Sequence, residues 1–414
     1  MAKTVPLDAA TLAWARGRFA DYYATARLDP PSRLARREFA AFPFAEATMM
    51  RRHATLRTPE EFAEFLRREV PRHVYYSTAY YQRPAAPNMA AKEWMGADLI
   101  FDLDSDHLRG AEQLDYAGQL ALVKARLLQL FDDFLTLDFD VERSTASIVF
   151  SGGRGYHVHI RDDRFLQLTS PDRRELVDYI MGVGVDAAAA IEHRRESVEA
   201  GRTLGAVDGE DGGGPGRRAP ARPIPHLCPR DAPGWRGRVS RSIRDRFARW
   251  GADGYDASLP EMRAYGLAPG QARRVVDGMW RRVAEDGALD VFPKTPPDDF
   301  FEHIVRSAAV PVQGETDAPV TTDIHRLIRL PNSLHGGTGL RVVPLDRAEV
   351  EAFDPFADAV TDRPGRVPVE FRADVDYPFP GGLRGHPGGT DELPTPQAVF
   401  LVLRGEAVPR PSPG

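Results

Sequence analysis

The stretch Ala97-Asp98-Leu99-Ile100-Phe101-Asp102-Leu103-Asp104 joins an apolar run to two carboxylates that stand two residues apart. Its length and apolar character are those of a core β-strand. Because side chains alternate along a strand, Asp102 and Asp104 share one face. Two crowded carboxylates repel each other unless a cation lies between them, and oxygen ligands suit Mg²⁺ or Mn²⁺. The stretch therefore predicts a divalent-metal site, with an acidic turn into solvent as the alternative.

A glycine-rich turn, Ser151-Gly152-Gly153-Arg154-Gly155, lies between two short apolar segments, and this pattern predicts a β-hairpin over residues 147–160. The glycines let the backbone approach a ligand closely, and the N–H groups of the turn together with Arg154 suit a phosphate. His157 and His159 share one face of the second strand. We therefore expect an anion-binding loop; an ordinary glycine turn with surface histidines is the alternative.

A third informative segment follows much later in the chain, around Asp317. We expect a helix that begins at Thr321 or Thr322 and ends at Pro331. Asp317 precedes this helix and is a candidate third metal carboxylate, with a loop acid as the alternative. The segment also brings cationic or potentially cationic side chains to the same region: Arg326, Arg329 and His335.

Composition limits the classes of protein to which the chain can belong. Its 414 residues exceed one ordinary domain, so we expect a core with an insertion or a second domain. The net charge of −6 argues against a generally basic coat, but nearly all basic residues are arginine, which favours contacts to phosphate. The single cysteine, Cys228, rules out a disulfide framework and a multi-cysteine zinc cluster. No apolar run reaches the roughly 20 residues of a membrane span and the N-terminus lacks a secretory signal, so we expect a cytoplasmic protein with no membrane partner.

The pattern of elements predicts an α/β protein of the α+β kind, in which mixed and largely antiparallel sheets are flanked by helices. We expect three parts, namely a discontinuous core, a helical insertion and a C-terminal tail: residues 1–165 with 295–360, residues 166–294, and residues 361–414. The insertion contains a loop rich in glycine, proline and arginine at about 200–235, which we expect to be disordered. The tail is expected to be loosely ordered, apart from a packed element near 394–403.

Three motifs follow one another along the chain: Phe101-Asp102-Leu103-Asp104, Ser151-Gly152-Gly153-Arg154-Gly155-Tyr156-His157, and Asp317 followed by Arg326-Leu327-Ile328-Arg329-Leu330-Pro331-Asn332-Ser333-Leu334-His335-Gly336. Together they resemble the catalytic (small) subunit of the archaeal and eukaryotic type of DNA primase. The resemblance extends to Arg37-Glu38-Phe39 and to residues 92–98 and 399–405. It covers most of the chain except the insertion loop and parts of the tail.

The resemblance implies a polymerase that starts chains on single-stranded DNA without a primer, by nucleotidyl transfer with two Mg²⁺ or Mn²⁺ ions. It implies that Asp102, Asp104 and Asp317 hold the ions, and it selects Asp317 over Asp323. It also implies a set of residues that bind the triphosphate of the incoming nucleotide: Ser151, Arg154, His157, Arg329, His335 and Arg52.

The resemblance further implies a heterodimer with a primase large subunit, nucleoside triphosphates as substrates, and a place at the nucleoid. One departure is the structural zinc site of the family, which a chain with only Cys228 cannot build from cysteines. We expect no structural zinc, with packing in its place and with His226 and Cys228 inert. Two alternatives stay open: a repair or translesion polymerase of the same fold, which would work without the large subunit, and a non-catalytic nucleic-acid-binding subunit.

Overall fold

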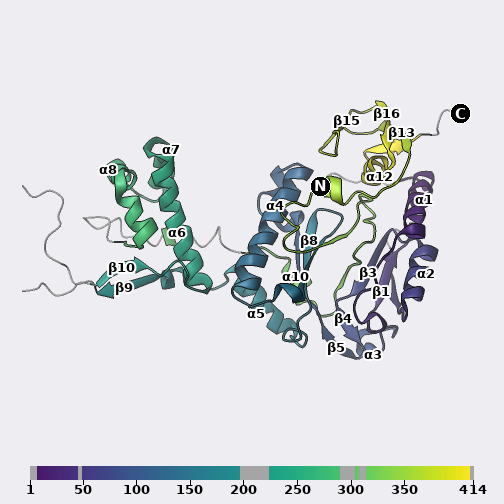
Figure 1. Cartoon of the computed structure of the whole chain (residues 1–414), viewed down its shortest axis with the longest axis horizontal. Helices are drawn as coiled ribbons and strands as arrows, with labels where there is room; N and C mark the ends of the chain where they lie inside the picture. Colours follow the sequence, from purple (N-terminus) through teal and green to yellow (C-terminus); the bar gives the residue numbers. More distant parts are fainter. Residues whose placement is uncertain are drawn as a thin grey trace, which may run out of the picture. The chain divides into compact units, whose positions relative to one another are not determined.

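The computed structural model describes residues 7–44, 49–195, 223–289, 304–305, 307 and 314–410. The chain divides into two compact units (Figure 1). The larger unit spans Met1–Met181 and Gly314–Gly414, and the smaller unit spans Gly182–Gln313. Antiparallel sheets flanked by helices make up the larger unit, which confirms the predicted α+β fold. Among the described residues, no helix is both long and apolar enough to cross a membrane.

A four-stranded antiparallel sheet contains the predicted acidic strand. Its strands, in the order in which they pair, are β12 (Val343–Leu345), β7 (Ala146–Phe150), β8 (Gly155–Ile160) and β6 (Leu99–Asp104). β7 and β8 form the predicted hairpin. The register of β6 against β8 sets Asp102 opposite His157 and Asp104 opposite Gly155. The acidic strand and the glycine-rich turn therefore meet at one end of the sheet.

A second antiparallel sheet joins the N-terminal part of the chain to the third motif. Its strands, in pairing order, are β11 (Leu327–Arg329), β3 (His73–Ser77), β1 (Phe39–Phe42) and β2 (Arg51–Ala54). The predicted helix that ends at Pro331 is therefore wrong, and a short helix, α10 (Ala318–Thr322), stops where it was expected to begin. Pairing with β3 is favoured because it buries Ile328 in the core. A smaller sheet of β4 (Ala79–Tyr81) and β5 (Trp94–Ala97) leads into β6.

Helices flank the sheets of the larger unit (Figure 1). Beyond α10 they are α1 (Ala9–Thr25), α2 (Pro59–Glu69), α3 (Met89–Lys92), α4 (Tyr116–Gln129), α5 (Ser170–Met181), α11 (Pro355–Asp358) and α12 (Thr395–Arg404). Short 3₁₀ segments span Leu34–Arg36, Ser105–His107, Ala111–Gln113 and Arg143–Thr145, and a π-helical turn, Leu130–Thr136, extends α4. α4 begins where it does because the Asp115 side chain accepts a hydrogen bond from the Gly118 N–H.

α5 belongs to the larger unit, although its residues were expected to be part of the insertion. Its Arg173 is buried and donates hydrogen bonds to the carbonyl oxygens of Ala97 (2.8 Å) and Asp98 (3.0 Å), directly before β6. Val177 on the same helix is also buried. Because these contacts tie the helix to the acidic strand, the structure divides the chain at Met181 rather than near residue 165.

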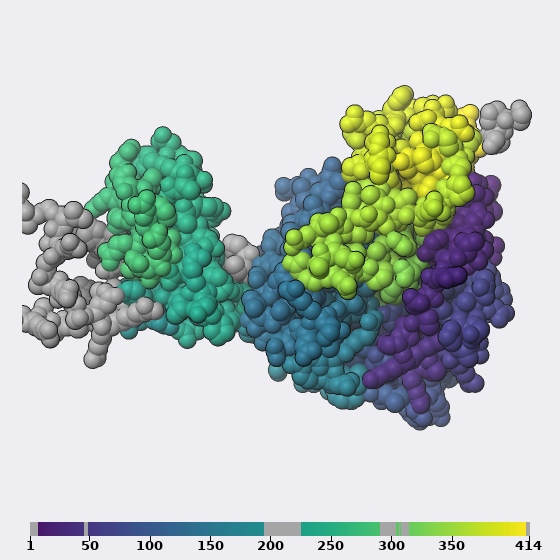
Figure 2. Space-filling view, in the orientation of Figure 1, coloured from purple at the N-terminus to yellow at the C-terminus, as the bar shows by residue number. Residues whose placement is uncertain are grey.

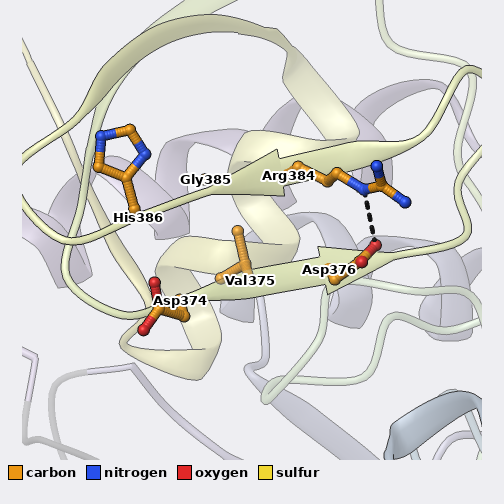
Figure 3. A pocket seen from close by; sticks show the side chains of 6 residues that line it. All are labelled: Asp374, Val375, Asp376, Arg384, Gly385 and His386. Carbon is orange, nitrogen blue, oxygen red and sulfur yellow. Dashed lines mark hydrogen bonds and ion pairs between the residues drawn. The ribbon is translucent and has the colours of Figure 1, made fainter.

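The C-terminal segment, residues 366–410, is folded rather than loosely ordered. Its strands form a three-stranded sheet and a hairpin: β16 (Thr390–Pro394), β13 (Arg366–Phe371) and β17 (Ala407–Pro409), and β14 (Val375–Tyr377) with β15 (Leu383–Gly385). α12 lies at the expected packed element, and most of its side chains are buried. Figure 2 shows this segment, in yellow, packed against the rest of the larger unit. A pocket of about 460 Å³ beside the hairpin contains none of the predicted site residues and is lined by Asp374, Val375, Asp376, Arg384, Gly385 and His386 (Figure 3).

The smaller unit is mainly helical. Its elements are β9 (Ile191–Arg195) paired with β10 (Pro223–Leu227), α6 (Gly234–Asp253), α7 (Tyr255–Ala264), α8 (Pro269–Arg274), a 3₁₀ segment (Ala187–Ala190) and two π-helical turns (Val275–Met279 and Arg282–Asp286). Most of the predicted disordered loop at about 200–235, namely residues 200–222, lies outside the described residues. Residues 223–235 of this loop are ordered, contrary to the prediction. β10 and the start of α6 flank the buried Cys228, whose N–H donates to the Ala190 carbonyl oxygen at 2.8 Å.

Candidate functional site

Three carboxylates predicted from separate motifs come together at the end of β6. Asp102 and Asp104 lie on the same face of the strand, as alternation requires. The Asp317 N–H donates a hydrogen bond of 2.8 Å to the Asp102 carbonyl oxygen, and the Thr316 hydroxyl donates to the same oxygen at 3.2 Å. These bonds fix the segment before α10 beside β6 and bring the third carboxylate to the first two.

The charge of this cluster is poorly compensated. Burial, followed by the charges of Asp104 and Asp317, raises the pKa of Asp102 to about 7, against the opposing effect of Arg326 and Arg329. A carboxylate that faces a close cation shows the opposite shift. As the side chains stand, the described residues contain no metal-binding group of three or more His, Cys, Asp or Glu side chains.

Two histidines flank the carboxylates. His157 Nε2 lies 3.4 Å from Asp102 Oδ1, and His107 Nε2 lies 3.6 Å from Asp317 Oδ2. Burial, followed by the charges of two nearby arginines, lowers the pKa of His157 to about 3. Its imidazole is therefore neutral at pH 7 and contributes a hydrogen-bonding group rather than a charge. No role was predicted for His107, whose only signal in the sequence is its place shortly after the acidic strand.

The turn of the β7–β8 hairpin, residues 151–155, forms what we call the anion loop. Ser151 Oγ accepts hydrogen bonds from two backbone N–H groups of the loop, each at 3.3 Å. Gly152 has a φ of +75°, and a Cβ there would lie 2.7 Å from the Cβ of His335. Glycine is therefore required at this position. The same close approach places His335, from the third motif, against the loop.

Arg154 links the anion loop to the acidic strand. Its guanidinium pairs with Asp106, and the Asp106 N–H donates to Asp104 Oδ1 at 3.2 Å. The side chains of Arg154 and Asp106 are 36% and 34% exposed, so a ligand can reach the pair. A phosphate could replace the Asp106 carboxylate on the guanidinium, because each group offers arginine two anionic oxygens that accept hydrogen bonds.

β11 brings Arg329 to the edge of the second sheet, where it meets two histidines. Arg329 Nη1 lies 2.7 Å from Nδ1 of His73 on β3, and its guanidinium lies 5.2 Å from the centre of the Tyr75 ring. The ring centres of His73 and His335 are 5.1 Å apart. Burial, followed by the charge of Arg329, lowers the pKa of both histidines well below its ordinary value. His73 was not among the predicted site residues, and its position at the start of a strand is its only signal in the sequence.

Arg52, on β2, is held by a different partner. Its Nε lies 3.1 Å from Glu38 Oε1, and its Nη2 donates to Glu38 Oε2 at 3.3 Å. Glu38 is fully buried, and Lys92 Nζ also lies 3.5 Å from it. Among the contacts of the described residues, none joins Arg52 to the anion loop or to His335. Its role in nucleotide binding therefore stays a prediction.

The fold and the site define an α+β protein in which clustered carboxylates lie beside an anion-binding loop. A family model described as DNA primase small subunit matches residues 101–347, which include every predicted site residue except Arg52. Proteins named DNA primase small subunit PriS match almost the whole chain. That of Methanocella arvoryzae is 38% identical over 96% of this chain and 98% of its own length, and that of Methanothrix thermoacetophila is 38% identical over 97% and 99%. The corresponding protein of Halobacterium salinarum is 37% identical over 97% and 99%.

These matches extend over both units of the chain and are not confined to the three motifs. The chain belongs to the DNA primase small-subunit family, which confirms the resemblance drawn from the motifs. The matches do not test the role of any single residue, Arg52 included.

Proposed function

We propose that this chain is the catalytic subunit of a DNA primase, which makes short primers de novo on single-stranded DNA by nucleotidyl transfer. One observation carries the proposal: the hydrogen bond from Asp317 to the Asp102 carbonyl oxygen unites carboxylates from separate motifs next to the anion loop. A repair polymerase of the same fold is not favoured, because the relatives that match nearly full length are named as primase subunits. The presence of all three carboxylates disfavours a non-catalytic subunit.

The residues present fit divalent metal ions. Asp102, Asp104 and Asp317 would hold Mg²⁺ or Mn²⁺, for which carboxylate oxygens are suitable ligands. The raised pKa of Asp102 supports this assignment, because it reflects burial of the carboxyl and, after that, the negative charges of Asp104 and Asp317, both of which a bound cation would offset. When bound, such ions make an attacking hydroxyl more acidic and stabilise the charge that develops on the leaving pyrophosphate.

The side chains around the anion loop would bind and orient the nucleoside triphosphate. Ser151, Arg154 and Arg329 offer hydroxyl and guanidinium donors to phosphate oxygens. His157 and His335 are neutral at pH 7, so they would donate N–H groups without adding charge. Permanent positive charge in the site would therefore come from the arginines, and nucleotide binding would not depend on histidine protonation near neutral pH.

We propose that the chain works as a heterodimer with a primase large subunit, since its relatives are named as small subunits. We also propose that it needs no structural zinc. Cys228 is buried, its Sγ lies 3.2 Å from the Arg236 carbonyl oxygen, and the Ser240 hydroxyl donates to the Cys228 carbonyl oxygen at 2.7 Å. His226 is buried as well. Packing of this kind would hold the smaller unit together in place of a metal.

Primer synthesis on single-stranded DNA, with labelled nucleotides and Mg²⁺ or Mn²⁺, tests the proposed function. Wild type with the large subunit should make oligonucleotides de novo, whereas the Asp102→Ala/Asp104→Ala variant should make none. A matched control is Asp374→Ala/Asp376→Ala, which also removes two aspartates two residues apart, here exposed at β14. Extension of supplied primers alone would favour the repair-polymerase alternative, and the absence of any synthesis by folded wild type would favour a binding role.

A further inference from the structure

Tyr116, the first residue of α4, reaches the anion loop. Its hydroxyl donates a hydrogen bond of 2.6 Å to the Gly153 carbonyl oxygen. The side chain is buried, and burial raises its pKa, so the phenol keeps its proton and remains a donor. On the neighbouring peptide, the Thr338 hydroxyl donates to the Gly152 carbonyl oxygen at 2.5 Å. Two hydroxyl groups from outside the loop therefore hold two successive carbonyl groups of its backbone.

Fixing these carbonyl groups also fixes the N–H groups of the same peptides. In a trans peptide the C=O and N–H bonds point in opposite directions. The bond from Tyr116 to the Gly153 carbonyl therefore turns the Arg154 N–H away from Tyr116. Among the described residues, the Gly153 N–H donates to Ser151 Oγ, whereas the Arg154 N–H donates to no group. This N–H is available to an anion in the loop.

Side chains of the C-terminal segment hold the Tyr116 ring. We call Tyr377, Phe400, Arg404 and Glu406 the C-terminal cluster. The Arg404 guanidinium lies 4.8 Å from the centre of the Tyr116 ring, and its Nε donates to the Tyr377 hydroxyl at 3.1 Å and to Glu406 at 2.9 Å. The ring centres of Tyr377 and Phe400 are 6.1 and 5.9 Å from that of Tyr116. The C-terminal cluster is thus connected to the anion loop through Tyr116.

We propose that Tyr116 is a positioning residue for nucleotide binding and that the C-terminal cluster acts on the anion loop through it. The inference rests on the proposed function, because it takes the anion loop to bind the triphosphate of the incoming nucleotide. Tyr116 does not touch the substrate; it sets the direction of the Arg154 N–H. The C-terminal segment, which carries no predicted site residue, thereby contributes to the affinity for nucleotide.

Tyr116→Phe tests this inference, because it removes the hydroxyl and leaves the ring inside the C-terminal cluster. Loss of one hydrogen bond corresponds to about three- to tenfold in affinity. We expect KM for the nucleoside triphosphate to rise by about that factor, while kcat changes by less than about twofold. Arg404→Lys keeps the charge but loses the planar guanidinium, so it should raise KM by a smaller factor. Tyr179→Phe is the matched control, since it removes a tyrosine hydroxyl that donates to Asp138 at 2.7 Å.

Kinetics are measured on the full chain with its partner subunit, and the Kd of a labelled nucleoside triphosphate is measured without template, so that no turnover occurs. KM and Kd should rise together in Tyr116→Phe and stay at wild-type values in Tyr179→Phe. An unchanged Kd in Tyr116→Phe, or an equal rise in the control, overturns the inference. Failure of wild type to make primers instead contradicts the proposed function, and the Kd comparison, which needs no turnover, separates the two failures.

Discussion

Asp98 and Asp102 belong to one short stretch of sequence, yet their carboxylates have opposite surroundings. Asp98 is buried with Arg37, whose Nη2 lies 2.8 Å from its Oδ2, and the Tyr80 hydroxyl donates to its other oxygen at 2.5 Å. Asp102 has two further carboxylates as neighbours and a pKa raised to about 7. A buried carboxylate with a fixed cation serves the fold, whereas one whose charge the protein leaves uncompensated is suited to a ligand.

The contacts around Asp98 hold β6 in place and so support Asp102 at the other end of the strand. Arg37 also donates to the Ser77 carbonyl oxygen at 2.7 Å, and Arg173 donates to the carbonyl oxygens of Ala97 and Asp98. Together with the Arg37–Asp98 pair, these bonds hold both the side chain and the backbone directly before β6. A strand held in this way can present Asp102 at its other end in a defined position, in spite of the repulsion there.

The largest expected effect comes from removing the charge of Asp98, the buried partner of Arg37. Asp98→Asn leaves the Arg37 guanidinium buried without a negative partner, which should lower the free energy of unfolding by about 3–5 kcal/mol. Urea denaturation at neutral pH measures the change. Asp163→Asn is the control, because its side chain is 90% exposed in a pair with Arg33 at 3.7 Å and should have no measurable effect. Equal stabilities of the two variants would show that the buried pair does not support the fold.

The sequence allowed the local features of both sheets to be predicted, but not the long-range pairings. Strand alternation placed Asp102 and Asp104 on one face, and the glycine-rich turn indicated the β7–β8 hairpin. The segment at Leu327–Arg329 was mistaken for a helix because its three residues are too few to show a strand period. Its conformation is decided by pairing with β3, which belongs to a distant part of the sequence.

The same reason explains which site residues were missed. His73, Tyr116 and Thr338 lie outside the motifs' recognised positions and act through side chains that touch Arg329 or the anion loop only after folding. The C-terminal segment was expected to be loose because of its proline and glycine content, yet its aromatic side chains pack against Tyr116. Contacts of this kind carry no local sequence signal.

The second prediction concerns the titration of Asp102 in metal-free protein. The Asp102 carboxyl loses its proton near pH 3.8 in the unfolded chain but near pH 7 in the folded protein. The protonated carboxyl therefore stabilises the folded state fully below pH 3.8, and this contribution is lost as the pH rises to about 7. At about 1.4 kcal/mol for each pH unit, the loss amounts to as much as about 4 kcal/mol.

Asp102→Asn removes this contribution together with the coupling of Asp102 to Asp104 and Asp317, whereas titrating groups that do not interact with Asp102 affect wild type and variant alike. The difference in unfolding free energy between the two proteins, measured by urea denaturation with a chelator present, should change steadily between about pH 4 and about pH 7. Addition of Mg²⁺ at a higher pH should then stabilise wild type and leave the variant almost unchanged. A difference that does not vary with pH would show that Asp102 is compensated in the way that Asp98 is.

The smallest effect is expected at a third kind of pair, that of Arg154 with Asp106, which is about one third exposed. Asp106→Asn should change the free energy of unfolding by less than about 1 kcal/mol, because solvent screens an exposed ion pair. It should also lower KM for the nucleoside triphosphate by about two- to threefold, since Asp106 would no longer compete with phosphate for the guanidinium. Asp106→Glu keeps the negative charge and serves as the control in the same steady-state assay. A rise in KM with Asp106→Asn would instead mean that Asp106 holds Arg154 in its binding position, and the exposed pair would then resemble that of Asp98 with Arg37.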